Sequence, residues 1–118
     1  MDSLDRYFGV HGAALALRSK RLDMIASNIA NAATPGDKAR DIDFATELKS
    51  AETGGIASIG TAQQRAMYRV PVQSSLDGNT VELATEQTAF AENAVQYQTT
   101  LSFLNSRIGT LMTALKGE

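Results

Sequence analysis

The sequence predicts an all-α protein in which two long helices, one at each end of the chain, pair as an antiparallel, coiled-coil-like hairpin. Apolar residues recur at steps of three and four near both ends, which is the spacing of an amphipathic helix. The apolar fraction is 43%, with only 6% aromatic residues and no tryptophan, so small and aliphatic side chains must fill the core. We expect one domain, with an N-terminal helix over 1–33, a flexible, partly extended middle segment over 34–79 and a C-terminal helix over 80–116.

The N-terminal helix is predicted from a seam whose spacing alternates between four and three residues, as in a heptad repeat. The seam consists of Leu4, Phe8, His11, Leu15, Arg18, Leu22, Ile25 and Ile29. A second line at seven-residue intervals contains Val10, Leu17 and Met24. Because a helix with two apolar lines buries two sides, we expect this helix to have more than one packing neighbour.

The C-terminal helix is predicted from two rows of residues at seven-residue intervals. The first row is Leu83, Phe90, Tyr97, Leu104 and Leu111, and the second is Ala94, Leu101, Ile108 and Leu115. Asn79 and Glu82 have the spacing of a capping box just before the apolar run. We expect the pairing seam of this helix to consist of Phe90, Tyr97, Leu101, Leu104, Ile108 and Leu111.

The polar face of the C-terminal helix is almost uncharged. From Gln87 to Ser106 the only formal charge is Glu92, and Val95 and Phe103 point away from the predicted seam. A solvated helix face normally carries lysine and glutamate. Two interpretations remain open at this point: a sparsely charged helix inside a small bundle, or a helix surrounded by other chains, with Val95 and Phe103 as its outward assembly face.

The middle segment has weaker signals. The run "DIDFATELKSA" predicts a short helix capped by Asp43, whereas the glycines of "ETGGIASIGTA" predict flexibility. The run "MYRVPV" alternates and is expected to be extended at a sheet edge, because proline cannot donate to a central ladder. An Asp-Gly turn in "SLDGNT" precedes the C-terminal helix.

Composition excludes several functional classes. A net charge of −2 and a pI near 5.3 do not provide the positive field that nucleic acid requires. There is no cysteine, and the single histidine, His11, has no second histidine with which to bind a transition metal. No phosphate-binding loop or catalytic triad is present, and no run approaches the roughly 20 apolar residues of a membrane span. We expect a protein that is not an enzyme, has no cofactor or metal, and neither spans a membrane nor begins with a cleaved secretory signal.

The run "SNIANAATPGD" at residues 27–37 ends the N-terminal helix with small residues and amides. Asn28 and Asn31 lie three residues apart on one face, where their amides can satisfy backbone groups of a loop or of a partner helix. Pro35 disfavours helical geometry at Thr34, and Pro35 with Gly36 suits the centre of a type II turn. The motif residues singled out as an assembly site are Asn28, Ile29, Ala30, Asn31, Thr34, Pro35 and Gly36.

The longer run "LRSKRLDMIASNIANAATPGDKARDIDF" resembles the N-terminal signature of the flagellar axial proteins, the rod and hook family. The runs "RDIDFATELK", "YRVPVQSSLDGNTVEL" and "AENAVQYQTTLSFLNSRI" resemble the members of this family that build the proximal rod. The resemblance covers nearly the whole chain and is weakest over 50–66. One position departs from the family pattern: an aromatic residue usually follows Pro-Gly, and this chain has Asp37.

The resemblance implies a structural subunit that assembles into the proximal part of the periplasm-spanning rod of the flagellar basal body. It implies as partners further copies of the chain, other rod proteins and the inner-membrane ring or adaptor at the rod base. It also implies export from the cytoplasm by the flagellar type III apparatus, without a cleaved signal peptide. The alternatives are another proximal rod protein of the same family and a cytoplasmic helical adaptor or export chaperone. We expect Asn28 and Asn31 to matter more for assembly than for the stability of the monomer.

Overall fold

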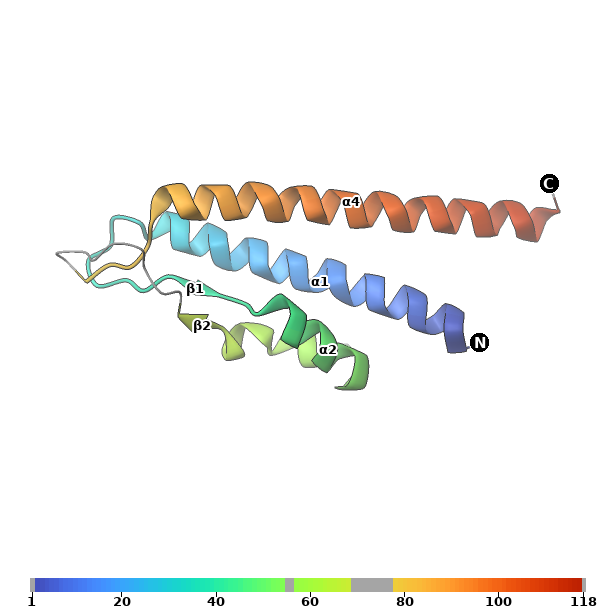
Figure 1. Ribbon diagram of the computed structural model, residues 1–118, viewed down its shortest axis with the longest axis horizontal. Helices are drawn as coiled ribbons and strands as arrows, with labels where there is room; N and C mark the ends of the chain where they lie inside the picture. The colour runs from blue at the N-terminus through green and yellow to red at the C-terminus, as the bar shows by residue number, and fades with distance from the viewer. Residues whose placement is uncertain (1, 55–56, 69–77, 118) are drawn as a thin grey trace.

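The protein is an elongated helical hairpin, which confirms the predicted fold class. Figure 1 shows the computed structural model, which describes residues 2–54, 57–68 and 78–117. Helices α1 (Asp2–Ala30) and α4 (Leu83–Lys116) run antiparallel and side by side, so that both chain ends lie at the same end of the molecule. The molecule measures 64 × 27 × 18 Å, and the two long helices give it this length.

Helix α1 is the central element. Helix α4 lies along one side of α1, and the other side is covered by the shorter elements of the middle segment (Figure 1). These elements are β1 (Arg40–Asp41), α2 (Phe44–Gly54), α3 (Ala57–Gly60), the 3-10 helix η1 (Ala62–Arg65) and β2 (Met67–Tyr68). The two short strands pair antiparallel, with Arg40 opposite Tyr68 and Asp41 opposite Met67. The rest of the predicted extended run, 69–72, lies outside the described residues.

The second apolar line of α1 packs against the middle segment. Leu17 and Met24 belong to a buried cluster that also contains Ala13, Ile42, Ala51, Ile59 and Ala62. This confirms the prediction that α1 has more than one neighbour. It also shows that the middle segment, which we expected to be flexible from its glycines, buries small apolar residues against α1.

Local capping explains where α2 begins. The backbone N–H of Thr46 donates to Oδ1 of Asp43 at 3.3 Å, and the Thr46 hydroxyl donates to Oδ2 at 2.9 Å. Asp43 therefore satisfies a free N–H at the start of the helix, as predicted.

The seam between α1 and α4 differs from the predicted one. Ile25 is fully buried and Leu104 is buried, while Leu15, Leu22, Tyr97, Leu101 and Leu111 are half-buried. In contrast, Phe90 and Ile108 are 39% and 45% exposed. A straight helix drifts by about 20° per heptad relative to a 3.5-residue repeat, so a continuous heptad row does not stay on one side unless the helices supercoil. This drift explains why Phe90 and Ile108 are less buried than the other residues of the predicted seam.

Candidate assembly site

The signature run at the end of α1 forms a compact turn. The N–H of Asn31 bonds to the carbonyl of Ser27 at 3.1 Å, and the N–H of Asp37 bonds to the carbonyl of Thr34 at 3.3 Å. Gly36, the third residue of the turn, has φ +76°. This is the geometry of a type II turn with proline second and glycine third, so the predicted turn is confirmed.

Replacing Gly36 by alanine is expected to lower the free energy of unfolding by about 1–2 kcal/mol, because L residues are strained at positive φ. An added Cβ would meet nothing within 4 Å, so the loss comes from backbone conformation alone. Asparagine tolerates this region better than alanine, and Gly36→Asn should therefore lose less. Urea denaturation of the two variants checks this, and equal losses would show that φ is not what glycine supplies here.

Asn79 holds the end of α1 from a distance in the sequence. Its side-chain Nδ2 donates to the carbonyls of Asn31, Ala32 and Thr34 at 3.0, 3.2 and 2.5 Å, and its Oδ1 accepts from the N–H of Val81 at 2.7 Å. Asn79 is buried, and its amide thus adds a bond from the loop before α4 to three carbonyls at and just after the end of α1. The predicted capping box is wrong: Glu82 is the N-cap of α4 and makes no side-chain cap bond.

Further bonds tie the two loops together into what we call the loop clasp, residues 31–39 with residues 78–81. The N–H of Thr80 donates to the carbonyl of Asp37 at 2.8 Å, and the Thr80 hydroxyl accepts from the N–H of Ala39 at 2.8 Å. The ammonium of Lys38 donates to the carbonyl of Gly78. Asp37, the position that departs from the family pattern, takes part through its carbonyl, so this contact does not depend on its side chain.

Asn28 does not face outward from the hairpin. Its Nδ2 donates to the carbonyl of Arg40 at 2.7 Å and to Oε2 of Glu86 at 3.0 Å, and its Oδ1 accepts from the N–H of Arg40 at 3.2 Å. Asn28 is buried and Glu86 is fully buried. One amide therefore joins α1 to both β1 and α4, which gives Asn28 a role inside the hairpin; the expectation that it matters more for assembly than for stability stays a prediction.

Asn31 has a different environment from Asn28 although the two are three residues apart. Its Nδ2 donates to the carbonyl of Ser27 at 2.9 Å, and its Oδ1 accepts from the Thr34 hydroxyl at 3.2 Å. Both bonds are exposed and local to the helix end. Ala30, Thr34, Pro35 and Gly36 are exposed and Ile29 is half-buried, so this part of the motif remains a candidate contact surface.

An ion pair fixes β1 against α1. Arg21 donates from Nε and Nη2 to the two carboxylate oxygens of Asp41 at 2.9 and 3.0 Å. These hydrogen bonds raise the pKa of Arg21. Burial lowers the pKa of Arg18, and the charge of Arg21 lowers it further. Both arginines remain charged, because a guanidinium is not deprotonated in proteins.

Arg18 of α1 contacts both α4 and α2, which lie on different sides of α1. Its Nη1 donates to Oε1 of Gln96 on α4 at 2.8 Å, and its guanidinium lies over the ring of Phe44 on α2, 4.2 Å from the centroid. The backbone carbonyl of Arg18 also accepts a hydrogen bond from Nδ2 of Asn93 at 2.8 Å. Polar contacts, rather than leucine alone, thus hold α4 on α1 along this stretch.

Helix α4 exposes several large apolar side chains. Val95 is 65% exposed and Phe103 is 47% exposed, but the Phe103 ring also packs against the ring of His11, with 5.4 Å between centroids. The other exposed large apolar residues of α4 are Leu83, Phe90, Ile108, Met112 and Leu115. A run of such residues on a helix with few charges is typical of a protein–protein interface.

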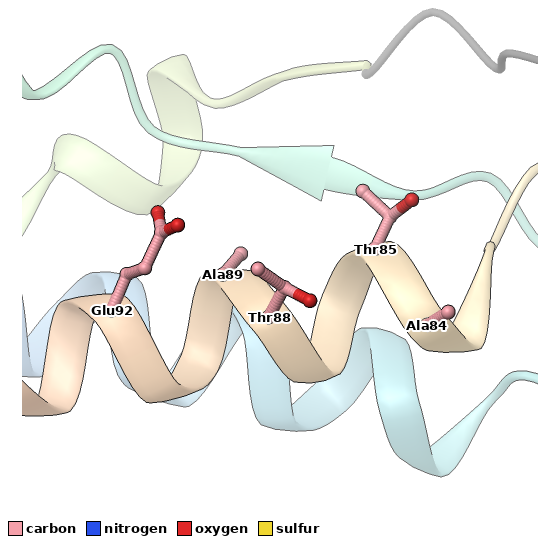
Figure 2. Close-up of a pocket in the computed structure, with 5 residues that line it drawn as sticks. All are labelled: Ala84, Thr85, Thr88, Ala89 and Glu92. Atoms are coloured by element: carbon pink, nitrogen blue, oxygen red, sulfur yellow. The ribbon is translucent and has the colours of Figure 1, made fainter.

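A shallow, open groove of about 400 Å³ runs along the first turns of α4. Its lining is Ala84, Thr85, Thr88, Ala89 and Glu92, and Figure 2 shows Thr85, Ala89 and Glu92 pointing to the same side of the helix. These small side chains allow another backbone to approach closely, but they include no nucleophile paired with a base.

The described part of the chain holds neither a cluster of metal-ligating side chains nor a membrane-spanning helix. Within it, no group of three or more histidine, aspartate or glutamate side chains is arranged to hold a metal ion. No helix there is long and apolar enough to cross a membrane.

Asn79, Glu86 and Asn93 are residues of this region whose buried contacts sequence reasoning missed. All three are polar and are buried. The sequence offers no local signal for the long-range bonds that they make, because the partners in these bonds lie 45 to 75 residues away in the chain.

The sequence of this chain is similar to a known protein family. The sequence model of the flagella basal body rod protein family matches residues 8–38. The flagellar basal body rod protein FlgB of Cereibacter sphaeroides is 54% identical over 93% of this chain and 94% of its own length. The FlgB proteins of Aeromonas hydrophila and Salmonella typhimurium are each 43% identical, over 98% and 99% of this chain and 97% and 98% of their own lengths. The chain therefore belongs to the FlgB family of flagellar basal body rod proteins.

Proposed function

We propose that this chain is a structural subunit of the proximal rod, where it assembles with further copies of itself, with other rod proteins and with the inner-membrane ring or adaptor at the rod base. The observation that carries the proposal is the full-length similarity to FlgB proteins together with the surface of α4. The helix is held on α1 by one side only, and it exposes large apolar residues that a neighbouring chain can bury.

The shape of the molecule supports a structural rather than a catalytic role. A hairpin of two long helices, closed at one end by the loop clasp, presents a long side surface to its neighbours (Figure 1). Burying apolar area along such a surface contributes roughly 25 cal/mol per Å². Exposed side chains distributed along α4 therefore favour contact with neighbouring chains over its whole length.

We also propose that the chain works outside the cytoplasm, in the periplasmic part of the basal body, after export by the flagellar type III apparatus without cleavage of a signal peptide. Membership of the rod family supports this proposal. An epitope-tagged copy should be found in purified basal bodies at its uncleaved mass. Recovery only from the cytoplasm would favour the adaptor or chaperone alternative.

Deletion and complementation test the function directly. The deletion strain should be non-motile and should lack rods in electron micrographs of its membranes, and a plasmid copy of the chain should restore both. Pull-down of the purified chain against each candidate rod and ring protein then identifies its neighbours. Normal motility and complete basal bodies in the deletion strain would overturn the proposal.

A further inference from the structure

Helix α4 buries polar side chains where its heptad rows predict apolar ones. The buried residues of α4 are Glu86, Asn93 and Leu104, whereas Leu83 and Phe90 are exposed. Glu86 and Asn93 are seven residues apart and follow Leu83 and Phe90 by three residues each. The N-terminal half of α4 therefore faces α1 with a polar row and leaves an adjacent apolar row at the surface.

The polar row, Glu86 and Asn93, and the apolar row, Leu83 and Phe90, lie close together around the axis of α4. At 3.6 residues per turn, residues three apart are separated by about 60° around the helix. A modest rotation of the N-terminal half of α4 would therefore exchange Phe90 for Asn93 in the contact with α1. Apolar burial favours that exchange, so some interaction must oppose it.

Hydrogen bonds to α1 oppose the rotation. Nδ2 of Asn93 donates to the backbone carbonyl of Arg18 at 2.8 Å, and Oε2 of Glu86 accepts from Nδ2 of Asn28 at 3.0 Å. Both bonds require the polar row to face α1. Rotation would leave these buried groups without partners, and a buried unpaired polar group is costly.

Asn93 is better suited to fixing the orientation of α4 on α1 than to filling the space between the helices. It is fully buried, and its Oδ1 is bonded to no protein group in the described ranges. A leucine at this position would fill the same space without a polar atom. A single buried asparagine in a helix pair fixes the arrangement of the helices and lowers their stability.

We propose that Asn93 is a positioning residue that fixes the rotation of the N-terminal half of α4 on α1, and so keeps Leu83 and Phe90 at the surface for a neighbouring subunit. The rotation is a property of the isolated chain. The use of the exposed row by a neighbouring subunit rests on the proposed function in the rod.

A single tryptophan can report the rotation, because the chain has none. Phe90→Trp places the reporter on the exposed row. Combined with Asn93→Leu, it should show a blue-shifted emission and a loss of acrylamide quenching, with helical circular dichroism retained. A side chain that serves only stability would give the opposite result, a red shift with partial unfolding.

Matched controls separate rotation from other effects. Asn105→Leu makes the same replacement at an exposed asparagine of α4 and should leave the Phe90→Trp spectrum unchanged. Val95→Trp reports a different side of the helix and should stay exposed in the Asn93→Leu background. Spectra are recorded over a range of protein concentrations, since a blue shift that grows with concentration would mean association and would overturn the proposal.

An unchanged spectrum in a folded Asn93→Leu protein would also overturn the proposal. If the leucine variant does not fold, Asn93→Ala removes the amide without added bulk; it should give the same blue shift, and an unchanged spectrum there counts against the proposal. Complementation of a deletion strain separates the rotation of α4 from the use of Leu83 and Phe90 by a neighbouring subunit. If α4 rotates but cells with Asn93→Leu swim normally, the surface role of Leu83 and Phe90 is wrong and the proposed function stands.

Discussion

Replacing Asn28 with leucine is expected to lower the free energy of unfolding of the isolated chain by about 2–4 kcal/mol. The amide of Asn28 bonds to both backbone groups of Arg40 and to the buried carboxylate of Glu86. Leucine has a similar volume, but it cannot form hydrogen bonds. The backbone groups of Arg40 and the carboxylate of Glu86 would each lose one hydrogen bond, and water cannot reach this buried position to replace it. Chemical denaturation followed by helical circular dichroism measures the loss.

Asn31→Ala is the matched control for this prediction. Within the described residues, the side chain of Asn31 bonds only to Ser27 and Thr34 of its own helix end, and these bonds are exposed. Exposed hydrogen bonds of this kind are worth about 1 kcal/mol or less, because water replaces them. If Asn31→Ala destabilises the chain more than Asn28→Leu does, the assignment of Asn28 to the interior of the hairpin is wrong.

The two long helices could be predicted from the sequence. So could the fact that α1 packs against a second neighbour besides α4. Alternation of apolar residues at three and four is a local property, and the second line through Leu17 and Met24 correctly indicated another neighbour for α1. The caps and turns made by neighbouring residues, such as Asp43 and Gly36, were also predictable. Each of these depends on residues within a few positions of one another.

The polar half of the interface could not be predicted in this way. Glu86 and Asn93 are residue types that normally face solvent, and their burial depends on partners supplied by Asn28 and by the backbone of α1. The heptad rows of α4 are compatible with two rotations of the helix, and long-range bonds such as these choose between them. The same limit applies to Asn79, whose spacing from Glu82 predicts a helix cap, whereas its amide bonds to carbonyls at the end of α1.

Val95→Glu is expected to leave the isolated chain folded and to abolish swimming. Val95 is 65% exposed, and substitutions at such positions usually change the free energy of unfolding by less than about 0.5 kcal/mol. In an assembled rod the same position is expected to face a neighbouring chain. A carboxylate buried there without a partner is strongly unfavourable, so rods should stop at their base.

Leu104→Glu provides the contrast, because Leu104 is buried on the side of α4 that faces α1. The charge should lower the free energy of unfolding by about 3 kcal/mol or more, and the loss should be visible in the purified chain. Phe103 is a poorer probe of the outward surface than Val95. Its ring packs on His11, so that Phe103→Glu would disturb an intrachain contact as well.

Val95→Thr separates charge from shape. Threonine has nearly the shape of valine and adds a hydroxyl, whose burial costs much less than that of a carboxylate, so swimming and basal bodies should be retained far better than with glutamate. Loss of motility with glutamate but not with threonine, in two chains of equal stability, would locate an intersubunit contact at Val95.

If Val95→Glu cells swim normally with complete rods, Val95 faces solvent in the rod. Other large apolar side chains that the hairpin leaves exposed on α4, such as Phe90 and Ile108, would then be the candidates for the surface that neighbouring chains cover.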